Sequence, residues 1–212
     1  MLSQESNRRD IVNLFDIIGP IMVGPSSSHT AGAVKIGYVS RKLIGEPIAE
    51  ATINLYGSFL ATGKGHGTRF AIVAGLLGMK LTFGEAELHD VHPNSAQLIL
   101  KGVSGKELEV VGESVGGSLI NIAQIDGIAA NFSGDYRTLI VHNVDQPGHV
   151  AEVTSMLAHK SINIATMQLY RSSRGGEAAM VIECDKEVPA ESIKWLAHLE
   201  GINKVTYYSL LN

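Results

Sequence analysis

The stretch that decides the fold of the second part of the chain runs from Leu139 to His159 and reads LIVHNVDQPGHVAEVTSMLAH. Apolar residues alternate at its start, which is typical of a strand with one buried face. A turn follows at Asp145-Gln146-Pro147-Gly148, and the apolar residues of Val150–His159 then recur with the period of an amphipathic helix. The sequence therefore predicts a strand joined to a helix by a short, rigid turn.

Outward from this unit, the same part of the chain predicts further strands and a second helix. The elements are strands at Asn163–Arg171 and Glu177–Cys184, a helix at about Ala190–Leu199 that Pro189 opens, and a last strand at Lys204–Leu210. The order is βαββαβ, which is the ferredoxin-like arrangement of two helices over a four-stranded sheet. This order predicts a fold and leaves the function open.

Glycine content divides the chain into two parts. Residues 1–135 contain 19 of the 23 glycines, and residues 136–212 contain the other four. The polar, turn-rich stretch 126–137 lies at the division and predicts a hinge. We therefore expect an α+β protein with a first domain over residues 1–135 and a second over residues 136–212.

Composition excludes several classes of protein. The 212 residues carry a net charge of −4 without a basic cluster, so we expect no nucleic-acid partner. The longest nearly apolar run, Ala71–Met79, is too short to cross a membrane, and residues 1–10 contain no apolar signal segment, so we expect a cytoplasmic protein. The single cysteine, Cys184, cannot form a disulfide or a cysteine-based metal site within one chain.

The densest group of polar residues lies near the start of the chain. Gly24-Pro25-Ser26-Ser27-Ser28-His29-Thr30-Ala31-Gly32 leads into a predicted helix at Ala31–Leu43. Hydroxyl groups and free backbone N–H groups at a helix N-terminus favour an anion such as a carboxylate. His29 adds an imidazole suited to proton transfer near neutral pH. The alternative is that Ser28 or Thr30 only caps the helix and that His29 is a surface residue.

A second glycine-rich stretch, Tyr56–Thr68 (YGSFLATGKGHGT), follows a predicted strand at Ala51–Leu55 and precedes a predicted helix at Arg69–Gly78. Its alternating glycines predict a loop whose backbone approaches a ligand closely. Lys64 contributes a positive charge and His66 a second imidazole. The order of residues matches neither a P-loop nor a dinucleotide-binding motif, so nucleotide binding has no support.

The stretch between these groups and the second domain is less informative. His89 and His92 have no spacing typical of a metal site, and we expect them in a surface loop. Residues 97–125 predict strands that are interrupted at 102–105 and at 112–118. The second interruption could be a β-bulge or a binding hairpin.

The second part of the chain resembles the ACT domain, a module that senses small molecules. The resemblance rests on Asp145–His149 (DQPGH), the helix after it, and Ser161–Ile164 (SINI). It implies an effector pocket, usually for an amino acid at a domain interface. The residues implied are Asp145, Pro147, Gly148, His149, Asn163 and Ile164. The alternative is a purely structural or dimerising copy, in which Pro147 and Gly148 only make a turn.

The first part of the chain resembles the β chain of the bacterial iron-sulfur L-serine dehydratases. The matching motifs are NLFDIIGP at 13–20, VGPSSSHT at 23–30, YGS at 56–58 and TGKGHGT at 62–68. The family converts L-serine to pyruvate and ammonia, and its first domain is similar to the allosteric substrate-binding domain of some 3-phosphoglycerate dehydrogenases. In its split form a separate α chain holds the [4Fe-4S] cluster, which agrees with the single cysteine here.

This resemblance implies roles for individual residues. His29 and His66 are the acid/base candidates, and either one can be the base. Substrate-binding residues would be Ser26, Ser27, Ser28, Thr30, Lys64, Gly65 and Thr68. An iron of the partner's cluster would polarise the serine hydroxyl, and this chain would contribute no metal ligand. The implied partners are the α chain and an amino acid, with a homodimer through the ACT domain or a hetero-oligomer. The alternative is a regulatory subunit that senses amino acids and has no catalytic residue.

Overall fold

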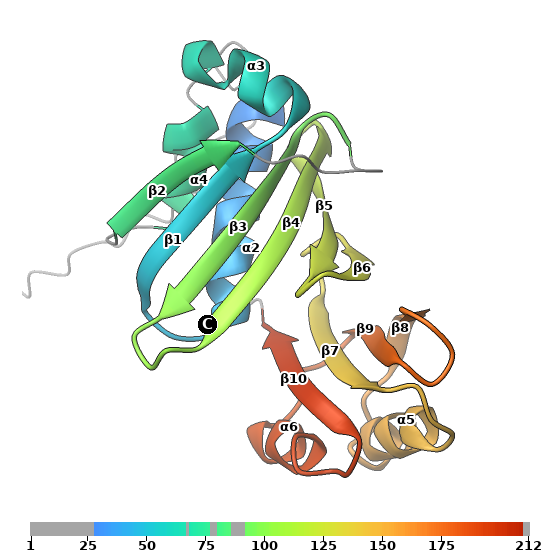
Figure 1. Cartoon of the computed structure of the whole chain (residues 1–212). Helices are drawn as coiled ribbons and strands as arrows, with labels where there is room; N and C mark the ends of the chain where they lie inside the picture. The colour runs from blue at the N-terminus through green and yellow to red at the C-terminus, as the bar shows by residue number, and fades with distance from the viewer. Residues whose placement is uncertain (1–27, 67, 77–79, 86–91, 210–212) are drawn as a thin grey trace, which may run out of the picture.

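The computed structural model of the chain describes residues 28–66, 68–76, 80–85 and 92–209. These residues form a six-stranded and a four-stranded β-sheet, and helices cover one face of each sheet (Figure 1). The predicted α+β class is therefore confirmed. Within the described ranges, no helix has both the length and the apolar character needed to span a lipid bilayer.

The six-stranded sheet belongs to the first part of the chain and has the strand order β2-β1-β3-β4-β5-β6. Its strands are β1 (Ile48–Leu55), β2 (Lys80–Glu85), β3 (Ser95–Gly102), β4 (Glu107–Gly116), β5 (Leu119–Ile125) and β6 (Ile128–Phe132). β1 and β2 are parallel, and the other neighbouring strands are antiparallel. The predicted hinge at 126–137 is wrong in part, because residues 128–132 pair with β5 as a strand.

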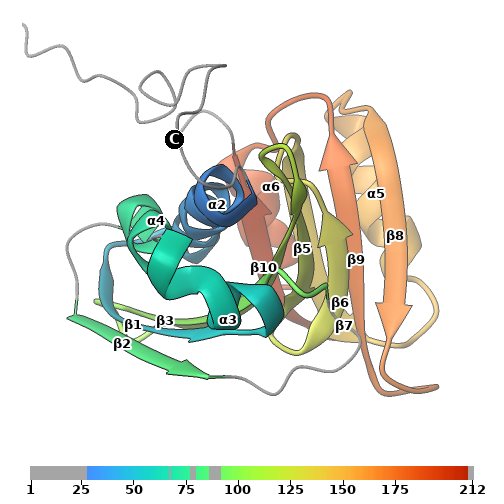
Figure 2. The same ribbon diagram turned by 90° about the horizontal axis from the view of Figure 1, so that it is seen from above.

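The helical segments that the structure describes in this part lie over one face of the sheet (Figure 2). They are the π-helical turn η1 (Ser28–Gly32) and the α-helices α2 (Ala33–Ile44), α3 (Gly57–His66) and α4 (Thr68–Leu76). The apolar side chains of α2, among them Ile36, Val39 and Leu43, enter the same core as those of β3 and β4. The helix predicted at 31–43 is therefore confirmed, with a more widely wound first turn.

The glycine-rich stretch after β1 is a helix, so the predicted loop is wrong. α3 forms although each glycine costs a helix roughly 1 kcal/mol relative to alanine. Phe59, in its first turn, is fully buried in the core, and this packing outweighs the low helix propensity. Gly57 has a φ of +55°, and a Cβ there would lie 2.3 Å from the carbonyl oxygen of Pro93. Only glycine fits where this helix begins.

The predicted interruption at 112–118 is a bulged part of β4. The strand continues to Gly116, and its pairing with β5 shifts register after Val111 and again after Ser114. A Cβ on Gly112 would lie 2.5 Å from Cγ2 of Ile36, so this glycine lets α2 approach the strand. The structure shows a bulge within β4 and also a hairpin turn at Gly117-Ser118 between β4 and β5, so the strand break is at 117–118 and the break predicted at residue 112 is wrong.

The four-stranded sheet belongs to the second part of the chain and has the order β10-β7-β9-β8. Its elements are β7 (Arg137–Val144), α5 (His149–His159), β8 (Ile164–Arg171), β9 (Glu177–Cys184), α6 (Ala190–Leu196) and β10 (Ile202–Tyr208). Every neighbouring pair is antiparallel. The predicted βαββαβ order is confirmed, and its helices and strands begin and end within a few residues of the predicted bounds.

The central strands of the four-stranded sheet, β7 and β9, are buried on both faces, whereas the edge strand β8 is partly exposed. Leu139 and Val141 of β7 point to the core beneath α5 and α6, whereas Ile140 between them belongs to the core of the first part. Val181 and Tyr208 join Ile140 in that first core. Figure 1 shows the consequence, with α5 and α6 below the four-stranded sheet and the first part of the chain above it.

Candidate functional site

The serine- and histidine-bearing segment forms η1, a π-helical turn that continues into α2. Such turns are rare and occur often at functional sites. η1 lies against β4, because a Cβ on Gly32 would come within 2.0 Å of the Ser114 Oγ. The close approach fixes where this turn lies relative to β4.

The two predicted polar segments meet at this point. The ring of His29 lies 5.3 Å from the ring of Phe59, between their centroids, at an angle of 59°. Because Phe59 is in the first turn of α3, the serine-rich turn and the glycine-rich segment are neighbours. His29 is buried, with 8% of the residue exposed. His66 ends α3, but its side chain, like that of Lys64, is outside what the structure describes.

The other predicted substrate-binding residues are placed unequally. Ser26 and Ser27 lie outside the described residues, Ser28 is described only by its backbone in η1, and Thr30 is half-buried in the same turn. Gly65 belongs to the last turn of α3. These positions do not test whether the predicted residues form one substrate-binding site, and that site stays a prediction.

Two fully buried hydroxyl groups close to η1 have no hydrogen-bond partner in the described part of the chain. They belong to Thr68, the first residue of α4, and to Ser114 of β4. Both elements pack against η1. An unsatisfied buried hydroxyl is costly, so two of them beside one turn mark a polar site and not an ordinary core.

A third segment reaches the same place and was not expected there. His92, predicted as a surface loop, is half-buried, and its N–H donates to Glu113 Oε1 at 3.0 Å. The carbonyl of Pro93 accepts from the N–H of Ser58 at 2.8 Å, and Asn94 Oδ1 accepts from the hydroxyl of Ser58. The segment therefore holds the N-terminus of α3. His92 lies in a loop, as predicted, but the residue is half-buried and not fully exposed at the surface. His89 lies outside the described residues.

The hydrogen bonds of His92 define its tautomer. Its Nδ1 accepts from the N–H of Asn94 at 3.1 Å, so the proton of the neutral ring is on Nε2. The sequence shows only that His92-Pro93-Asn94 directly precedes the strand β3, and that α3 begins at this end of the sheet is known only from the structure. Recognising the arrangement requires the strand pairing of β3 with β4, which places Asn94 beside Ser114.

A second candidate site is a cavity of about 290 Å³ in the C-terminal part, beside the turn after β7. It is lined by Asn143, Asp145, Gln146, His149, Val150, Leu169, Tyr170, Arg171, Ala178, Ala179 and Met180. A backbone hydrogen bond from Gly175 and the Arg171 guanidinium hold the pKa of Asp145 below its ordinary value. The cavity therefore contains a charged pair, a buried amide and a buried imidazole, which suit a small zwitterion.

Only part of the predicted effector set lies at this cavity. Asp145 and His149 line it, and Pro147 and Gly148 are exposed in the adjacent turn. Asn163 and Ile164 are at the start of β8, whereas the cavity is at the end of this strand, about 17 Å or more away along it. β7 and β8 both pair antiparallel with β9 and so run in the same direction. Within one chain, Asn163 and Ile164 therefore do not reach the cavity beside Asp145.

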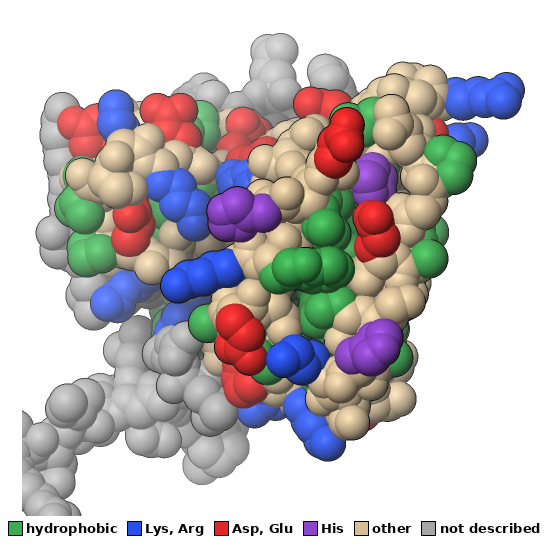
Figure 3. Space-filling view, turned by 90° about the horizontal axis from the view of Figure 1, so that it is seen from below, with side chains coloured by type: hydrophobic (Ala, Val, Ile, Leu, Met, Phe, Trp, Pro, Cys, Tyr) green, Lys and Arg blue, Asp and Glu red, His purple; other side chains and the backbone are tan. Residues whose placement is uncertain are grey.

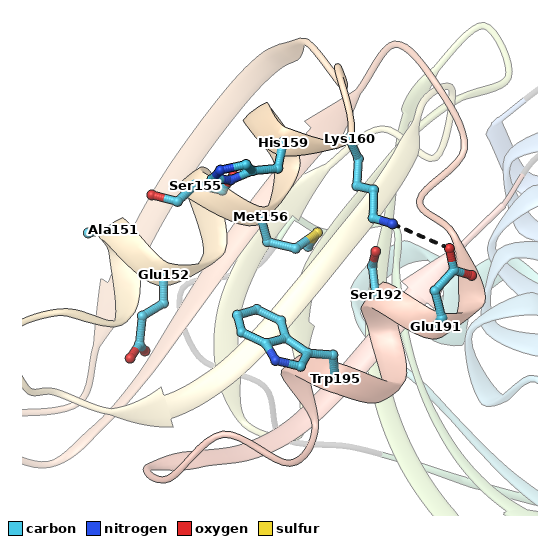
Figure 4. Close-up of a pocket in the computed structure, with 9 residues that line it drawn as sticks. All are labelled: Ala151, Glu152, Ser155, Met156, His159, Lys160, Glu191, Ser192 and Trp195. Atoms are coloured by element: carbon cyan, nitrogen blue, oxygen red, sulfur yellow. Dashed lines mark hydrogen bonds and ion pairs between the residues drawn. The ribbon is translucent and has the colours of Figure 1, made fainter.

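An apolar groove of about 670 Å³ lies between α5 and α6 on the C-terminal part. Met156 and Trp195 face each other across it, and an ion pair of 3.5 Å between Lys160 and Glu191 closes one end (Figure 4). Figure 3 views this side of the molecule and shows hydrophobic side chains bordered by acidic, basic and histidine side chains. Nothing predicted from the sequence points to this groove.

The residues of this chain do not fit an iron-sulfur cluster. Cys184 is 1% exposed at the end of β9, and burial, followed by the nearby Asp185, raises the pKa of its thiol to about 11. A cluster requires several cysteine thiolates, and this chain has one cysteine. Among the described residues, no group of three or more histidine, cysteine, aspartate and glutamate side chains is arranged to hold a metal ion.

The fold and its sites define a two-part α+β protein that ends in an ACT domain, and a family profile for the ACT domain matches residues 137–194. A profile described as serine dehydratase beta chain matches residues 11–114. The chain belongs to the L-serine dehydratase β-chain family, because relatives of that description match it along most of its length.

Two such relatives are bacterial. A probable L-serine dehydratase β chain of Bacillus subtilis is 38% identical, over 92% of this chain and 96% of the relative. The L-serine dehydratase β chain of Peptoniphilus asaccharolyticus is 35% identical, over 91% and 94%. A D-3-phosphoglycerate dehydrogenase of Methanocaldococcus jannaschii is 33% identical over 46% of this chain and 19% of its own length. The predicted resemblances to the L-serine dehydratase β chains and to 3-phosphoglycerate dehydrogenase are both confirmed.

Proposed function

We propose that this chain is the β subunit of an L-serine dehydratase, which deaminates L-serine to pyruvate and ammonia together with an α chain. Its membership of the β-chain family over nearly its full length supports the proposal. The single observation that carries the site is the contact of His29 with Phe59, which joins the serine-rich turn to α3. The serine-rich turn and the glycine-rich segment, which both carry motifs that match the family, therefore lie next to each other.

The proposed reaction needs a proton to leave the α-carbon of serine and the β-hydroxyl group to depart. His29 or His66 removes the α-proton or holds the carboxylate, and the sequence leaves open which does which. Ser26, Ser27, Ser28, Thr30, Lys64, Gly65 and Thr68 are the proposed contacts of the substrate. Elimination gives aminoacrylate, which tautomerises to an imine and hydrolyses to pyruvate and ammonia in water.

We assign the [4Fe-4S] cluster to the α chain, since the residues of this chain do not fit it. This assignment makes the chain inactive alone and active in the complex. His29 is only 8% exposed, so the substrate cannot reach it easily in this chain alone. For a catalytic role, the α chain has to bind near the serine-rich turn and make His29 accessible to the substrate.

The burial of His29 also supports a second candidate function. A subunit that senses amino acids without catalysing the reaction needs no accessible imidazole in its first domain. In that case catalysis belongs entirely to the α chain. The two functions differ in what a histidine variant loses, which is turnover in one and only the dependence on serine concentration in the other.

The cavity beside Asp145 is the proposed effector site. The Asp145–Arg171 pair, with its 3.2 Å contact, can receive the amino and carboxylate groups of an amino acid. Since β8 is an edge strand, a second copy paired antiparallel along it would bring its own Asn163 and Ile164 to this cavity. Titration calorimetry with L-serine tests the site, and unchanged binding by Arg171→Ala would remove it.

The catalytic proposal is tested on the complex reconstituted with the α chain. His29→Ala and His66→Ala are compared by their rate of pyruvate formation, and we expect at least one to lower kcat by about 100-fold or more. The exposed His198 gives the matched control, and His198→Ala should keep wild-type turnover. Wild-type turnover in both test variants would remove the catalytic role of this chain.

A further inference from the structure

A group of side-chain hydrogen bonds joins the C-terminal sheet to the first sheet. Asn131 of β6 donates through Nδ2 to the hydroxyl oxygen of Tyr170 on β8, at 3.0 Å. The hydroxyl of Tyr170 donates to Gln168 Oε1, and Gln168 Nε2 donates to the carbonyl of Asn131 at 3.0 Å. The three residues form a closed ring of bonds. Tyr170 is also a wall of the cavity beside Asp145.

Asn131 is held in an unusual backbone conformation that continues these bonds across the first sheet. Its φ is +47°, and β6 shifts register against β5 between Ile122 and Gln124. A bulge of this kind redirects a side chain at the edge of a sheet. Here Asn131 Oδ1 accepts from Asn121 Nδ2 at 3.1 Å. Asn121 Nδ2 also donates to Glu113 Oε2 at 3.0 Å.

Glu113 connects this path to the candidate reaction site. It is paired with Asn121 across β4 and β5, and its other carboxylate oxygen accepts from the N–H of His92. From His92 the bonds continue through Asn94 to Ser58, the residue next to Phe59. Phe59 contacts the ring of His29. The chain of contacts thus runs from the wall of one candidate site to the neighbour of the other.

We propose that Glu113 is a positioning residue that sets the place of His92–Asn94 and of α3, and that Tyr170 acts on it through Asn131 and Asn121. A change at the cavity in the C-terminal part is then transmitted to the surroundings of His29. Calling the ends of the path a reaction site and an effector site rests on the proposed function. The mechanical linkage itself does not, because it concerns only bonds within this chain.

The linkage is tested first without any activity, by amide hydrogen exchange of the full chain. The amides of His92 and Asn94 report on the far end of the path, since both donate within it. Tyr170→Phe removes the hydroxyl that bonds to Asn131 and Gln168, next to the cavity. Asn121→Ala removes the amide that bonds to Asn131 and Glu113, in the middle of the path. We expect both variants to speed exchange at these amides by about threefold or more, while the amides of β1 and β3 keep their wild-type rates.

Two matched controls separate transmission from general loosening. Tyr136→Phe removes a hydroxyl from a tyrosine that is half exposed in the connection between the sheets, and Gln124→Ala shortens a half-buried polar side chain of β5. Both should leave exchange at His92 and Asn94 unchanged. Unchanged exchange in Tyr170→Phe, or equal acceleration in the controls, would overturn the linkage.

The positioning role is tested in the complex with the α chain by steady-state kinetics. Glu113→Ala should lower kcat about tenfold with little change in KM, because Glu113 does not contact the substrate. Glu113→Gln retains an oxygen that can accept from His92, so it should recover most of the rate. Equal loss in both variants overturns the positioning role. If the complex has no serine dehydratase activity at all, the proposed function fails while the exchange experiment still decides the linkage.

Discussion

Gly32 shows how a single residue places the candidate site. Its sequence context suggests a glycine that makes room for a ligand, whereas in the structure the room is taken by Ser114. A Cβ at this position would lie 2.0 Å from Oγ and 2.7 Å from Cβ of Ser114. The glycine is therefore required for packing η1 onto β4, and its contribution to the site is indirect.

We predict that Gly32→Ala destabilises the chain by about 2 kcal/mol, because an extra carbon in a filled interior forces neighbouring groups apart. Urea unfolding of the purified chain measures the change. Combining it with Ser114→Gly removes the clashing atoms, so the double variant should be more stable than the two separate losses imply. A Gly32→Ala chain as stable as wild type would contradict the close packing of η1.

The residues of the site were predictable where they form a local pattern. Hydroxyl groups, a histidine and glycines before a helix make His29 a candidate from the sequence alone, and the structure adds its contact with Phe59. The contributions of His92 and Glu113 come from residues distant in sequence that strand pairing brings together, and a single sequence carries no periodic signal for them. For the same reason the sequence did not show that the predicted Asn163 lies far from the Asp145 turn, because this distance follows from strand direction and not from spacing.

At the scale of elements, the second part was predicted well and the first part less so. β7 and β9 are short apolar runs bounded by clear turns, so local rules suffice. α3 was missed because its glycines argue for a loop, and the burial of Phe59 that overrides them depends on the whole core. β6 was missed because its five residues lie among turn-forming residues and are stabilised by pairing with β5.

Glu187 joins β7 to β10 and to the residue that follows β10, and it should make the stability of the C-terminal part depend on pH. It accepts from Arg137 of β7 at 2.6 Å, from Tyr207 of β10 at 2.7 Å, and from Ser209 at 2.9 Å. Burial alone would raise the pKa of Glu187, but these hydrogen bonds outweigh it and lower the pKa below the ordinary value of 4.5. The ionised Glu187 therefore stabilises the folded chain fully at pH values above 4.5. This contribution to the free energy of unfolding is lost as the pH falls through the lower pKa of the folded state.

We predict that the urea midpoint of the wild-type chain falls between about pH 6 and about pH 3.5, and that Glu187→Gln reduces this fall. The variant should also have a lower midpoint at the higher pH, because the ionised acceptor is missing. Glu200 is exposed, so Glu200→Gln should keep the wild-type pH dependence. Identical pH profiles for Glu187→Gln and wild type would show that the carboxylate does not stabilise the fold.

At the scale of the whole molecule, the two parts share a core although the sequence divides them at residue 135. Ile140 and Val181 of the C-terminal sheet are at most 1% exposed and pack with the first part. The hydroxyl of Tyr208 donates to the carbonyl of Gly134 at 2.9 Å, and Lys204 pairs with Asp126. Because side chains of the C-terminal sheet complete the core of the first part, the two parts should not unfold independently.

We therefore predict one cooperative unfolding transition for the full chain. The single tryptophan, Trp195 on α6, reports on the second part, and hydrogen exchange of β1 and β3 amides reports on the first. Their urea midpoints should coincide, and Tyr208→Phe should lower both together by about 1 kcal/mol through the loss of one buried hydrogen bond. A chain ending at residue 135 should not fold stably, because it would expose the surface that Ile140 and Tyr208 cover. Two separated midpoints would instead make the ACT domain an independent unit, and the path from Tyr170 to Glu113 would then join bodies that move apart.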